Sequence, residues 1–285
     1  MMHFTDFNSA CADVDEMFLK AKPLKIEKWQ AVEVEGRPQS QMRELLNFSL
    51  SYEIPVWAFD LAGEVRPNLP WAEDHFKERV GGEPLNPPPS NEWWPFAQAG
   101  NSEFKKDEVF SHTYPERMWP KWAGETYAEM PLSDSVDWEP HRGIRYDYGD
   151  LEDVVVQLKK DPLTRQAYLP IWFPEDTGAV HGERVPCTLG YHFLIRDRTL
   201  QITYYIRSCD YMRHFRDDVY MAARLAQWMV DRYNEDAAMY EIIGVGKLYM
   251  HIVSFHIFEA DVPMLEHRRK QNRLEVSRRL MEKLG

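Results

Sequence analysis

The stretch RVPCTLGYHFLIRDRTLQITYYIRSCDYMRHFRDD, residues 184–218, decides the fold because it contains two alternating segments separated by a turn. Residues 188–197 and 199–208 both alternate apolar and polar side chains, a period of two that is typical of strands with one buried face. The sequence therefore predicts a long antiparallel hairpin. Its open ends bring Cys187, just before the first strand, close to Arg207 near the end of the second.

The segments around this hairpin predict both helices and strands. The predicted helices are at residues 13–21, 151–160, 218–233 and, as a charged solvent-facing tail, 263–284; the further predicted strands are at residues 43–54, 165–172 and 248–258. Prolines and glycines at about 80–110 predict a loop-rich insertion. We therefore expect a single α+β domain over residues 1–285, with a central mixed or antiparallel sheet packed with helices.

The composition narrows the class of function. A formal net charge of −12 is the opposite of the basic face that nucleic-acid binding normally needs, although a few arginines in a pocket suffice for one phosphate. There is no run of eighteen apolar residues and no basic-then-apolar leader, so we expect a cytoplasmic protein without a membrane partner. Three cysteines without a CxxC pair predict free thiols and no metal site.

Cys187 has two interpretations. A lone cysteine is most often a small buried residue. A guanidinium near a thiol, however, favours the thiolate, which is a nucleophile. Cys187 is therefore either a core residue or a nucleophile that nearby cations such as Arg207 activate. His251 and His256 make a poor pair of metal ligands, because residues five apart on a strand face opposite sides.

The same residues resemble the catalytic segment of the thymidylate synthases, where Pro-Cys-His precedes Arg-Ser-Cys-Asp or Arg-Ser-Asn-Asp at the spacing of Cys187 and Arg207. KDPLTRQAYLPIW at 160–172 is similar to the family's Asp-Pro-x-Ser-Arg-Arg segment, and MHIVSFHIF at 250–258 to its His-x-Tyr-Ser-x-His strand. The motifs follow the family's order over residues 110–260. The resemblance implies a homodimer through the sheet, a pyrimidine nucleoside monophosphate as substrate and 5,10-methylenetetrahydrofolate as co-substrate.

The resemblance also implies a role for each matching residue. Cys187 would add to C6 of the pyrimidine. The implied ligands of the nucleotide are Arg207 and Ser208 for the phosphate, Arg165 for the phosphate of the other subunit, the Asp210 amide for O2, and His251 for the sugar. Gln166 stands where the family has a second arginine, which weakens the phosphate grip. Arg37 is either a further phosphate ligand or a solvated turn residue.

Three further positions complete the implied site. Tyr114, in HTYPERMW, resembles the tyrosine that takes part in removing the C5 proton, or is a core tyrosine. Glu73, in a helical Glu-x-x-aromatic pattern, is preferred as the catalytic glutamate over Glu44, since residues 43–54 read as a strand. Trp93 or Trp94 would flank the folate, whose pterin the Asp210 carboxylate would also face.

Asp218 lies eleven residues after Arg207, where thymidylate synthases carry an asparagine. A carboxylate offers only acceptors, so it suits the amino group of cytosine and opposes the O4 carbonyl of uracil. A mismatch of this kind costs on the order of several kcal/mol in a buried site. A proton shared with N3 would also make C6 more electrophilic. The alternative is that Asp218 is only the N-cap of the helix at 218–233.

Cys187-Thr188, FLIRD and FRDD resemble the phage deoxycytidylate hydroxymethylase branch of the family, in which water captures the one-carbon unit. The implied product is 5-hydroxymethyl-dCMP, a precursor for DNA modification, together with tetrahydrofolate. Val253 replaces the family's sugar-binding tyrosine, so CMP stays open as the substrate. A thymidylate synthase, a dCMP methylase and an inactive nucleotide-binding relative remain alternatives.

Overall fold

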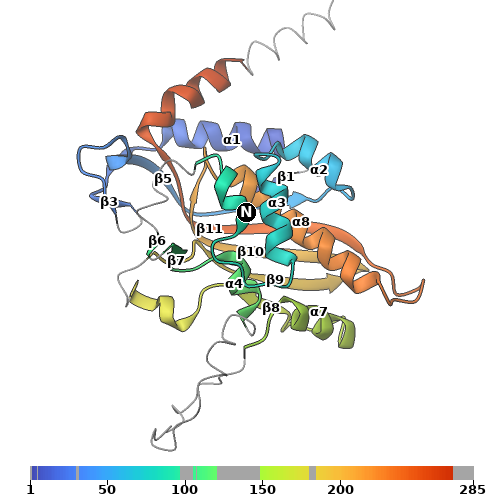
Figure 1. The fold of residues 1–285 in the computed structure, drawn as a ribbon. Helices are drawn as coiled ribbons and strands as arrows, with labels where there is room; N and C mark the ends of the chain where they lie inside the picture. The colour runs from blue at the N-terminus through green and yellow to red at the C-terminus, as the bar shows by residue number, and fades with distance from the viewer. Residues whose placement is uncertain are drawn as a thin grey trace, which may run out of the picture.

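The structure, a computed structural model, describes residues 2–4, 6–29, 32–96, 105–106, 108–120, 148–179 and 184–271. A seven-stranded sheet runs through its centre in the order β1-β5-β11-β10-β9-β8, with β2 paired to β5 (Figure 1). Its strands are β1 (Met2–Phe4), β2 (Pro23–Lys25), β5 (Gln41–Glu53), β8 (Tyr168–Pro170), β9 (Thr188–Arg196), β10 (Thr199–Asp210) and β11 (Gly244–Phe258). β1 and β5, and β10 and β11, pair in parallel and the other pairs are antiparallel, so the predicted mixed sheet is confirmed.

Helices pack against this sheet. They are α1 (Phe7–Lys20), α2 (Ala58–Val65), α3 (Trp71–Val80), α4 (Tyr114–Met118), α7 (Leu151–Lys160) and α8 (Phe215–Asn234). Short 3-10 turns are η1 (Pro38–Ser40), η2 (Pro89–Trp93), η4 (Pro174–Ala179) and η5 (Glu259–Asp261), and two small ribbons pair β3 (Lys28–Trp29) with β4 (Val32–Glu33) and β6 (Lys105–Lys106) with β7 (Val109–Phe110). The predicted α+β class is therefore confirmed.

The β9–β10 hairpin is confirmed. Its turn consists of Asp197 and Arg198, both with positive φ of 49° and 57°, as a two-residue hairpin turn requires. At the open end, the backbone amide of Arg207 donates to the carbonyl of Cys187 over 2.8 Å. The two motif residues are therefore fixed side by side by the sheet itself.

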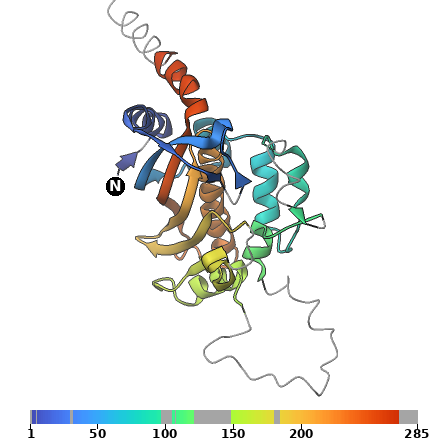
Figure 2. The same ribbon diagram turned by 90° about the vertical axis from the view of Figure 1, so that its left-hand side faces the viewer.

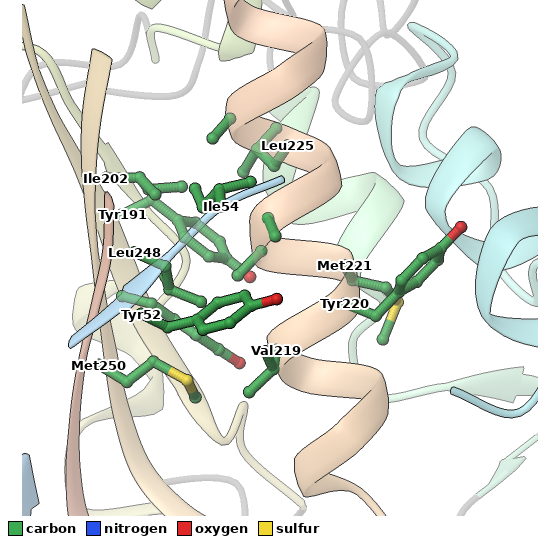
Figure 3. Packing of buried hydrophobic residues seen from close by; sticks show 14 of the residues in the cluster. Tyr52, Ile54, Tyr191, Ile202, Val219, Tyr220, Met221, Leu225, Leu248 and Met250 are labelled. Carbon is green, nitrogen blue, oxygen red and sulfur yellow. The ribbon is translucent and has the colours of Figure 1, made fainter. Parts of the chain in front are cut away.

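The helix α8 covers one face of the sheet, which we call the inner face. Val219 and Leu225 of α8 meet Tyr191, Ile202 and Leu248 of the sheet in a fully buried layer (Figure 3). α3 in turn packs on α8, so both helices lie on the same side of the sheet (Figure 2). This stacking carries α3 to the end of β10, where the candidate site lies.

The opposite, outer face carries apolar side chains that remain exposed. Along β10 the buried residues alternate with half-exposed ones, so that Tyr204 faces inward and Tyr205 outward. Leu46 of β5, Val253 of β11 and Tyr168 of β8 are 68%, 47% and 41% exposed. A sheet face that leaves such groups in water is a typical surface for association.

The last described element is a helix that begins at residue 262 and continues to the limit of the described residues at 271. Arg268 anchors it by donating to the buried Asp15 of α1 and to the hydroxyl of Tyr211. The predicted tail helix therefore starts as expected, and residues 272–284 lie outside the described residues. In the predicted insertion, residues 81–96 contain only the short turn η2, while 97–104 lie outside the description. No helix in the described ranges is long and apolar enough to cross a bilayer.

Candidate active site

A cavity of about 170 Å³ opens where β10 ends between α3, α4 and α8. Six residues that the sequence singled out line it: Trp94, Tyr114, Cys187, Ser208, Asp210 and Asp218. They come from four separate parts of the chain, and the sheet and helix packing brings them to one place. The cavity therefore joins the implied nucleophile, the implied proton acceptor and the implied base-selecting residue.

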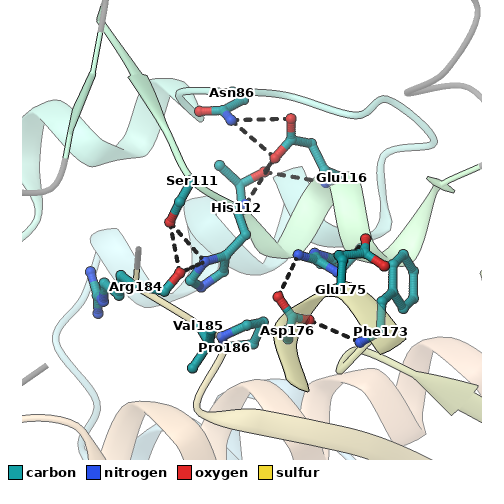
Figure 4. Close-up of polar contacts among 12 residues, drawn as sticks. Asn86, Ser111, His112, Glu116, Phe173, Glu175, Asp176, Arg184, Val185 and Pro186 are labelled. Carbon is teal, nitrogen blue, oxygen red and sulfur yellow. Dashed lines mark hydrogen bonds and ion pairs between the residues drawn. The ribbon is translucent and has the colours of Figure 1, made fainter. Parts of the chain in front are cut away.

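The nucleophile segment is clamped from both sides. Arg207 donates through Nε to the Pro186 carbonyl over 2.8 Å and through Nη2 to the Val185 carbonyl over 3.0 Å. Ser111 donates to the carbonyl of Arg184, and His112 contacts the same oxygen through Nδ1 (Figure 4). These bonds fix the backbone that presents the half-buried thiol of Cys187 to the cavity.

Tyr114 is the first residue of α4. Thr113 caps that helix, in a capping box with Glu116, which sets where the helix starts. The guanidinium carbon of Arg79 lies 4.1 Å from the centre of the Tyr114 ring. Burial, and then the nearby Cys187, raise the pKa of Tyr114, so its phenol is protonated at neutral pH.

Asp218 lies in the first turn of α8, but it is not the cap. The N-cap is His214, whose carbonyl accepts from the Asp218 amide over 2.8 Å, so the cap interpretation of the sequence is wrong. The thiol of Cys209 donates to Oδ2 of Asp218 over 3.4 Å. Burial raises the pKa of Asp218 to about 7, against the opposing charge of Arg79. Its carboxyl can therefore either give or hold a proton near neutral pH.

Asp210 is more constrained than the sequence implied. Its carboxylate accepts from the amides of Met212 and Arg213 and pairs with the Arg213 guanidinium at 3.0 Å. The carboxylate thus closes the turn between β10 and α8. Ser208, two residues earlier, lines the cavity and is half-exposed.

Two aromatic pairs form a wall of the cavity. Trp94 stacks on His214 with ring centres 5.8 Å apart, and Trp71 stacks on His75 at 5.2 Å. The buried Nε1 of Trp94 has no hydrogen-bond partner among the described residues. Trp93 is 45% exposed and does not line the cavity. Of the two adjacent tryptophans that the sequence left open, Trp94 is the one at the site.

The other predicted nucleotide ligands lie outside this cavity. Alternation along β10 directs Arg207 to the outer face, 5.9 Å from the ring centre of Trp172. Arg165 and Gln166 are exposed before β8, and His251 stacks on Tyr205 at 5.4 Å and contacts Ser49. Arg37 is exposed at the start of η1. The structure thus places Ser208, which was expected to bind phosphate, with the base-facing residues, and separates the other expected phosphate and sugar ligands from them.

Glu73 requires a correction, because its carboxylate points away from the cavity. It accepts from Nε of Arg224 at 3.0 Å and from the hydroxyl of Tyr220 at 2.8 Å, which ties α3 to α8. Glu44, the rival, accepts from Ser254 on the sheet and does not line the cavity either. Neither carboxylate is placed to act on a molecule bound beside Cys187.

Several cavity residues were given no specific role by the sequence: Trp71, His75, Arg79, His112, His214 and His256, the last considered only as a poor metal ligand. The only local signal was the spacing of four between the three residues of α3, which is ordinary for a packed helix. Burial lowers the pKa of His75 and His214 to about 4 and that of His112 to about 3, so all three are neutral at pH 7. Among the described residues no cluster of histidines, cysteines and carboxylates could hold a metal ion.

Comparison with known proteins agrees with this arrangement. The family model described as thymidylate synthase matches residues 105–282, which is more than half of the chain. A protein of Methanosarcina acetivorans named "Putative thymidylate synthase" is 24% identical over 171 residues, covering 56% of this chain and 74% of its own length. A protein of the same name from Methanococcoides burtonii is 26% identical over 168 residues, with coverage of 56% and 73%.

A third relative, named "Thymidylate synthase" in Buchnera aphidicola, is 29% identical over 96 residues, or 33% of this chain and 34% of its own. The family match contains Cys187, Arg207 and Asp218. The chain therefore belongs to the thymidylate synthase family, whose members transfer a one-carbon unit from methylenetetrahydrofolate to a pyrimidine nucleotide.

Proposed function

We propose that the protein is a folate-dependent cytidylate 5-hydroxymethyltransferase, which converts dCMP, methylenetetrahydrofolate and water into 5-hydroxymethyl-dCMP and tetrahydrofolate. The observation that carries this proposal is the half-buried carboxyl of Asp218 in the same cavity as Cys187 and Tyr114. Thymidylate synthases place an amide at this position, and the change from amide to carboxyl alters which base edge is complementary.

The base pairing follows from the carboxyl's two oxygens. Oδ2 of Asp218 already accepts from Cys209, so protonation is favoured on Oδ1. In the proposed complex Oδ1 shares its proton with N3 of cytosine, and Oδ2 accepts from the N4 amino group. With uracil both contacts fail, because the N3–H donor would face the Oδ1–H donor and the O4 acceptor would face the Oδ2 acceptor. A pKa of about 7 supplies the shared proton at neutral pH.

The proposed reaction assigns one step to each group. The thiolate of Cys187 forms a bond to C6, and the proton shared by Asp218 draws electrons toward N3. C5 then bonds to the one-carbon unit that methylenetetrahydrofolate supplies, and Tyr114 takes part in removing the C5 proton. As tetrahydrofolate leaves, its two bonds to the methylene carbon break and its nitrogens gain one proton from C5 and one from water. The hydroxide left from that water adds to the methylene carbon now on C5, and the Cys187–C6 bond breaks to release the product.

The residues fit the co-substrate. The indole of Trp94 and the imidazole of His214 are stacked in the cavity. Nε1 of Trp94, which has no partner in the part of the chain that the structure describes, offers a donor to a heterocycle with nitrogen and oxygen acceptors. We assign the pterin to this wall. Asp210, which the sequence placed against the pterin, would act mainly by holding the turn that carries His214.

The phosphate is assigned to the outer face, in a homodimer through the sheet. Nε and Nη2 of Arg207 are held by backbone carbonyls, and no bond of Nη1 occurs within the described ranges, so Nη1 is free for a phosphate oxygen. Arg165 of the partner, Arg37 and Gln166 would complete the phosphate site, and His251 would contact the sugar. The exposed Leu46 and Val253 supply apolar surface for the contact.

A second candidate is a thymidylate synthase acting on dUMP. The same pKa of about 7 favours it, because a neutral carboxyl with its proton on Oδ2 would pair with O4 and N3–H of uracil. The hydrogen bond from Cys209 to Oδ2 opposes that proton position, so we rank cytosine first.

The test is a product assay by mass spectrometry with dCMP, CMP and dUMP in competition, each with methylenetetrahydrofolate. We expect the gain of CH2O on a cytosine nucleotide without formation of dihydrofolate. The gain of CH2 on dUMP with dihydrofolate would instead establish the second candidate. Preference for CMP over dCMP would show that the substrate carries ribose, a question left open because Val253 replaces the family's sugar-binding tyrosine.

A further inference from the structure

Arg79 is a buried cation without a counter-ion in the described part of the chain. It lies in the last turn of α3, is 4% exposed and lines the cavity. Its guanidinium forms no ion pair with any described residue, and Nε has no hydrogen-bond partner there. An unpaired buried charge lowers the stability of the fold. Such a group beside a cavity is therefore a candidate for a role in the function of the site.

The groups around Asp218 show what this charge acts on. Among the described residues, the titratable groups that face Asp218 are Arg79 from α3, Tyr114 from α4, Tyr191 from β9, Tyr204 and Cys209 from β10, and Asp217 from α8. Arg79 is the single cation of this set. It also contacts the Tyr114 ring directly at 4.1 Å, so both proton-handling groups of the proposed reaction lie within its field.

We propose that Arg79 is a positioning residue, whose fixed positive charge sets how Asp218 and Tyr114 exchange protons with the bound pyrimidine. This inference rests on the proposed function. As the bond from Cys187 to C6 forms, the Oδ1 proton moves to N3 and leaves a carboxylate that Arg79 stabilises. When the bond to Cys187 breaks, the proton returns to Oδ1, so no proton is gained or lost.

Without Arg79 this exchange becomes harder, because the effect of burial on the pKa of Asp218 is then opposed only by the hydrogen bonds from Cys209 and Tyr204. The carboxyl would keep its proton more tightly and polarise N3 less. We therefore expect a loss in kcat rather than in KM. The ring of Tyr114 would also lose the cation against its face, so its phenol would accept or release the C5 proton less readily.

The first experiment titrates Asp218 directly, by NMR of the ligand-free protein with aspartate carboxyls labelled with carbon-13, using Asp218→Asn to assign the signal. We expect the Asp218 midpoint near pH 7 in the parent protein. In Arg79→Met it should rise by about 1 pH unit, and in Arg79→Lys it should stay near the parent value. Arg224→Met, which removes a half-buried guanidinium paired with Glu73 outside the cavity, is the matched control and should not move it. An unchanged midpoint in Arg79→Met would overturn the inference. Arg79→Gln serves the same comparison if Arg79→Met does not fold.

The second experiment follows exchange of the C5 hydrogen of dCMP with solvent from pH 5.5 to 9. We expect the rate to fall above the Asp218 midpoint and this limb to move to higher pH in Arg79→Met, with a maximum about tenfold lower. If the parent exchanges no cytosine nucleotide, the proposed function fails, while the titration still decides the effect of Arg79. If the parent protein exchanges the C5 hydrogen of dCMP and Arg79→Met shows the same rate and the same fall at high pH, only the inference about Arg79 fails.

Discussion

On its inner face the sheet ends in a cavity whose ionisable groups are half-buried or buried and mostly uncharged, whereas its outer face exposes apolar side chains beside arginines and a histidine. Asp218 and Tyr114 belong to the first environment, and Arg207 and Arg165 to the second. Cys187 stands between them, with its thiol toward the cavity and its carbonyl bonded to the Arg207 amide.

The contrast suggests a division between the two faces, in which the inner cavity binds the base of the nucleotide and the outer face binds its phosphate. Proton transfer and base selection gain from low dielectric and from the exclusion of water, which the inner cavity provides. A phosphate needs cations that keep their charge at all times, and it can be held at a surface that a partner subunit covers. The following predictions test this division, beginning with the largest effect.

Replacing Cys187 by serine removes the nucleophile and should abolish both the product and C5 exchange, by at least about 10³-fold. A hydroxyl of much higher pKa cannot supply the anion that adds to C6. Nucleotide binding should survive, which isothermal titration with dCMP would show. Retained exchange in Cys187→Ser would mean that Cys187 is only a core residue.

Replacing Arg207 by lysine should raise KM for the nucleotide by about 10- to 100-fold, because a point charge replaces a planar donor fork. Arg198→Lys is the matched control. Arg198 also donates from Nε and Nη2 to a carbonyl, that of Ile242, but at the far end of the same hairpin. An equal effect of both variants would show that Arg207 serves the hairpin and not the phosphate.

Placing a charge on the outer face should separate the proposed dimer. Leu46→Asp should weaken association by about tenfold or more, measured by analytical ultracentrifugation, since a buried unpaired carboxylate is costly. Met239→Asp is the control, because Met239 is 86% exposed in the connection between α8 and β11 rather than on the sheet. Dissociation of the dimer in both variants, or in neither, would argue against the outer face of the sheet as the interface.

The smallest effect on catalysis is expected from Glu73→Gln. Losing the ion pair with Arg224 should lower the free energy of unfolding by about 1 kcal/mol and change C5 exchange by less than about twofold. Chemical denaturation and the exchange assay measure the two quantities. A large loss of exchange at unchanged stability would restore Glu73 as the catalytic glutamate that the sequence suggested.

The fold was predictable where the signal was local. The two-residue period of β9 and β10 and the helical spacing of α8 identified these elements almost to their ends. The motif order then identified Cys187 and Asp218 together. These features depend on residues close in sequence, so a pattern alone can reveal them.

The rest depended on packing that no local pattern records. Trp71, His75 and Arg79 read as one face of an ordinary helix, and only the stacking of α3 on α8 brings them over the end of β10. Glu73, on the same helix, looked equally eligible until its pairing with Arg224 was visible. Adjacent Trp93 and Trp94 differ only in the direction that the turn η2 gives them.

The most direct test of base selection compares C5 exchange on dCMP and dUMP for the parent protein and for Asp218→Asn. Asp217→Asn, which changes the neighbouring carboxylate bonded to Asn68, controls for a general disturbance of α8. We predict that the parent prefers dCMP and that Asp218→Asn shifts the preference toward dUMP by about 10²-fold or more, while Asp217→Asn keeps the parent's preference. The same base preference in the parent and in Asp218→Asn would contradict the account.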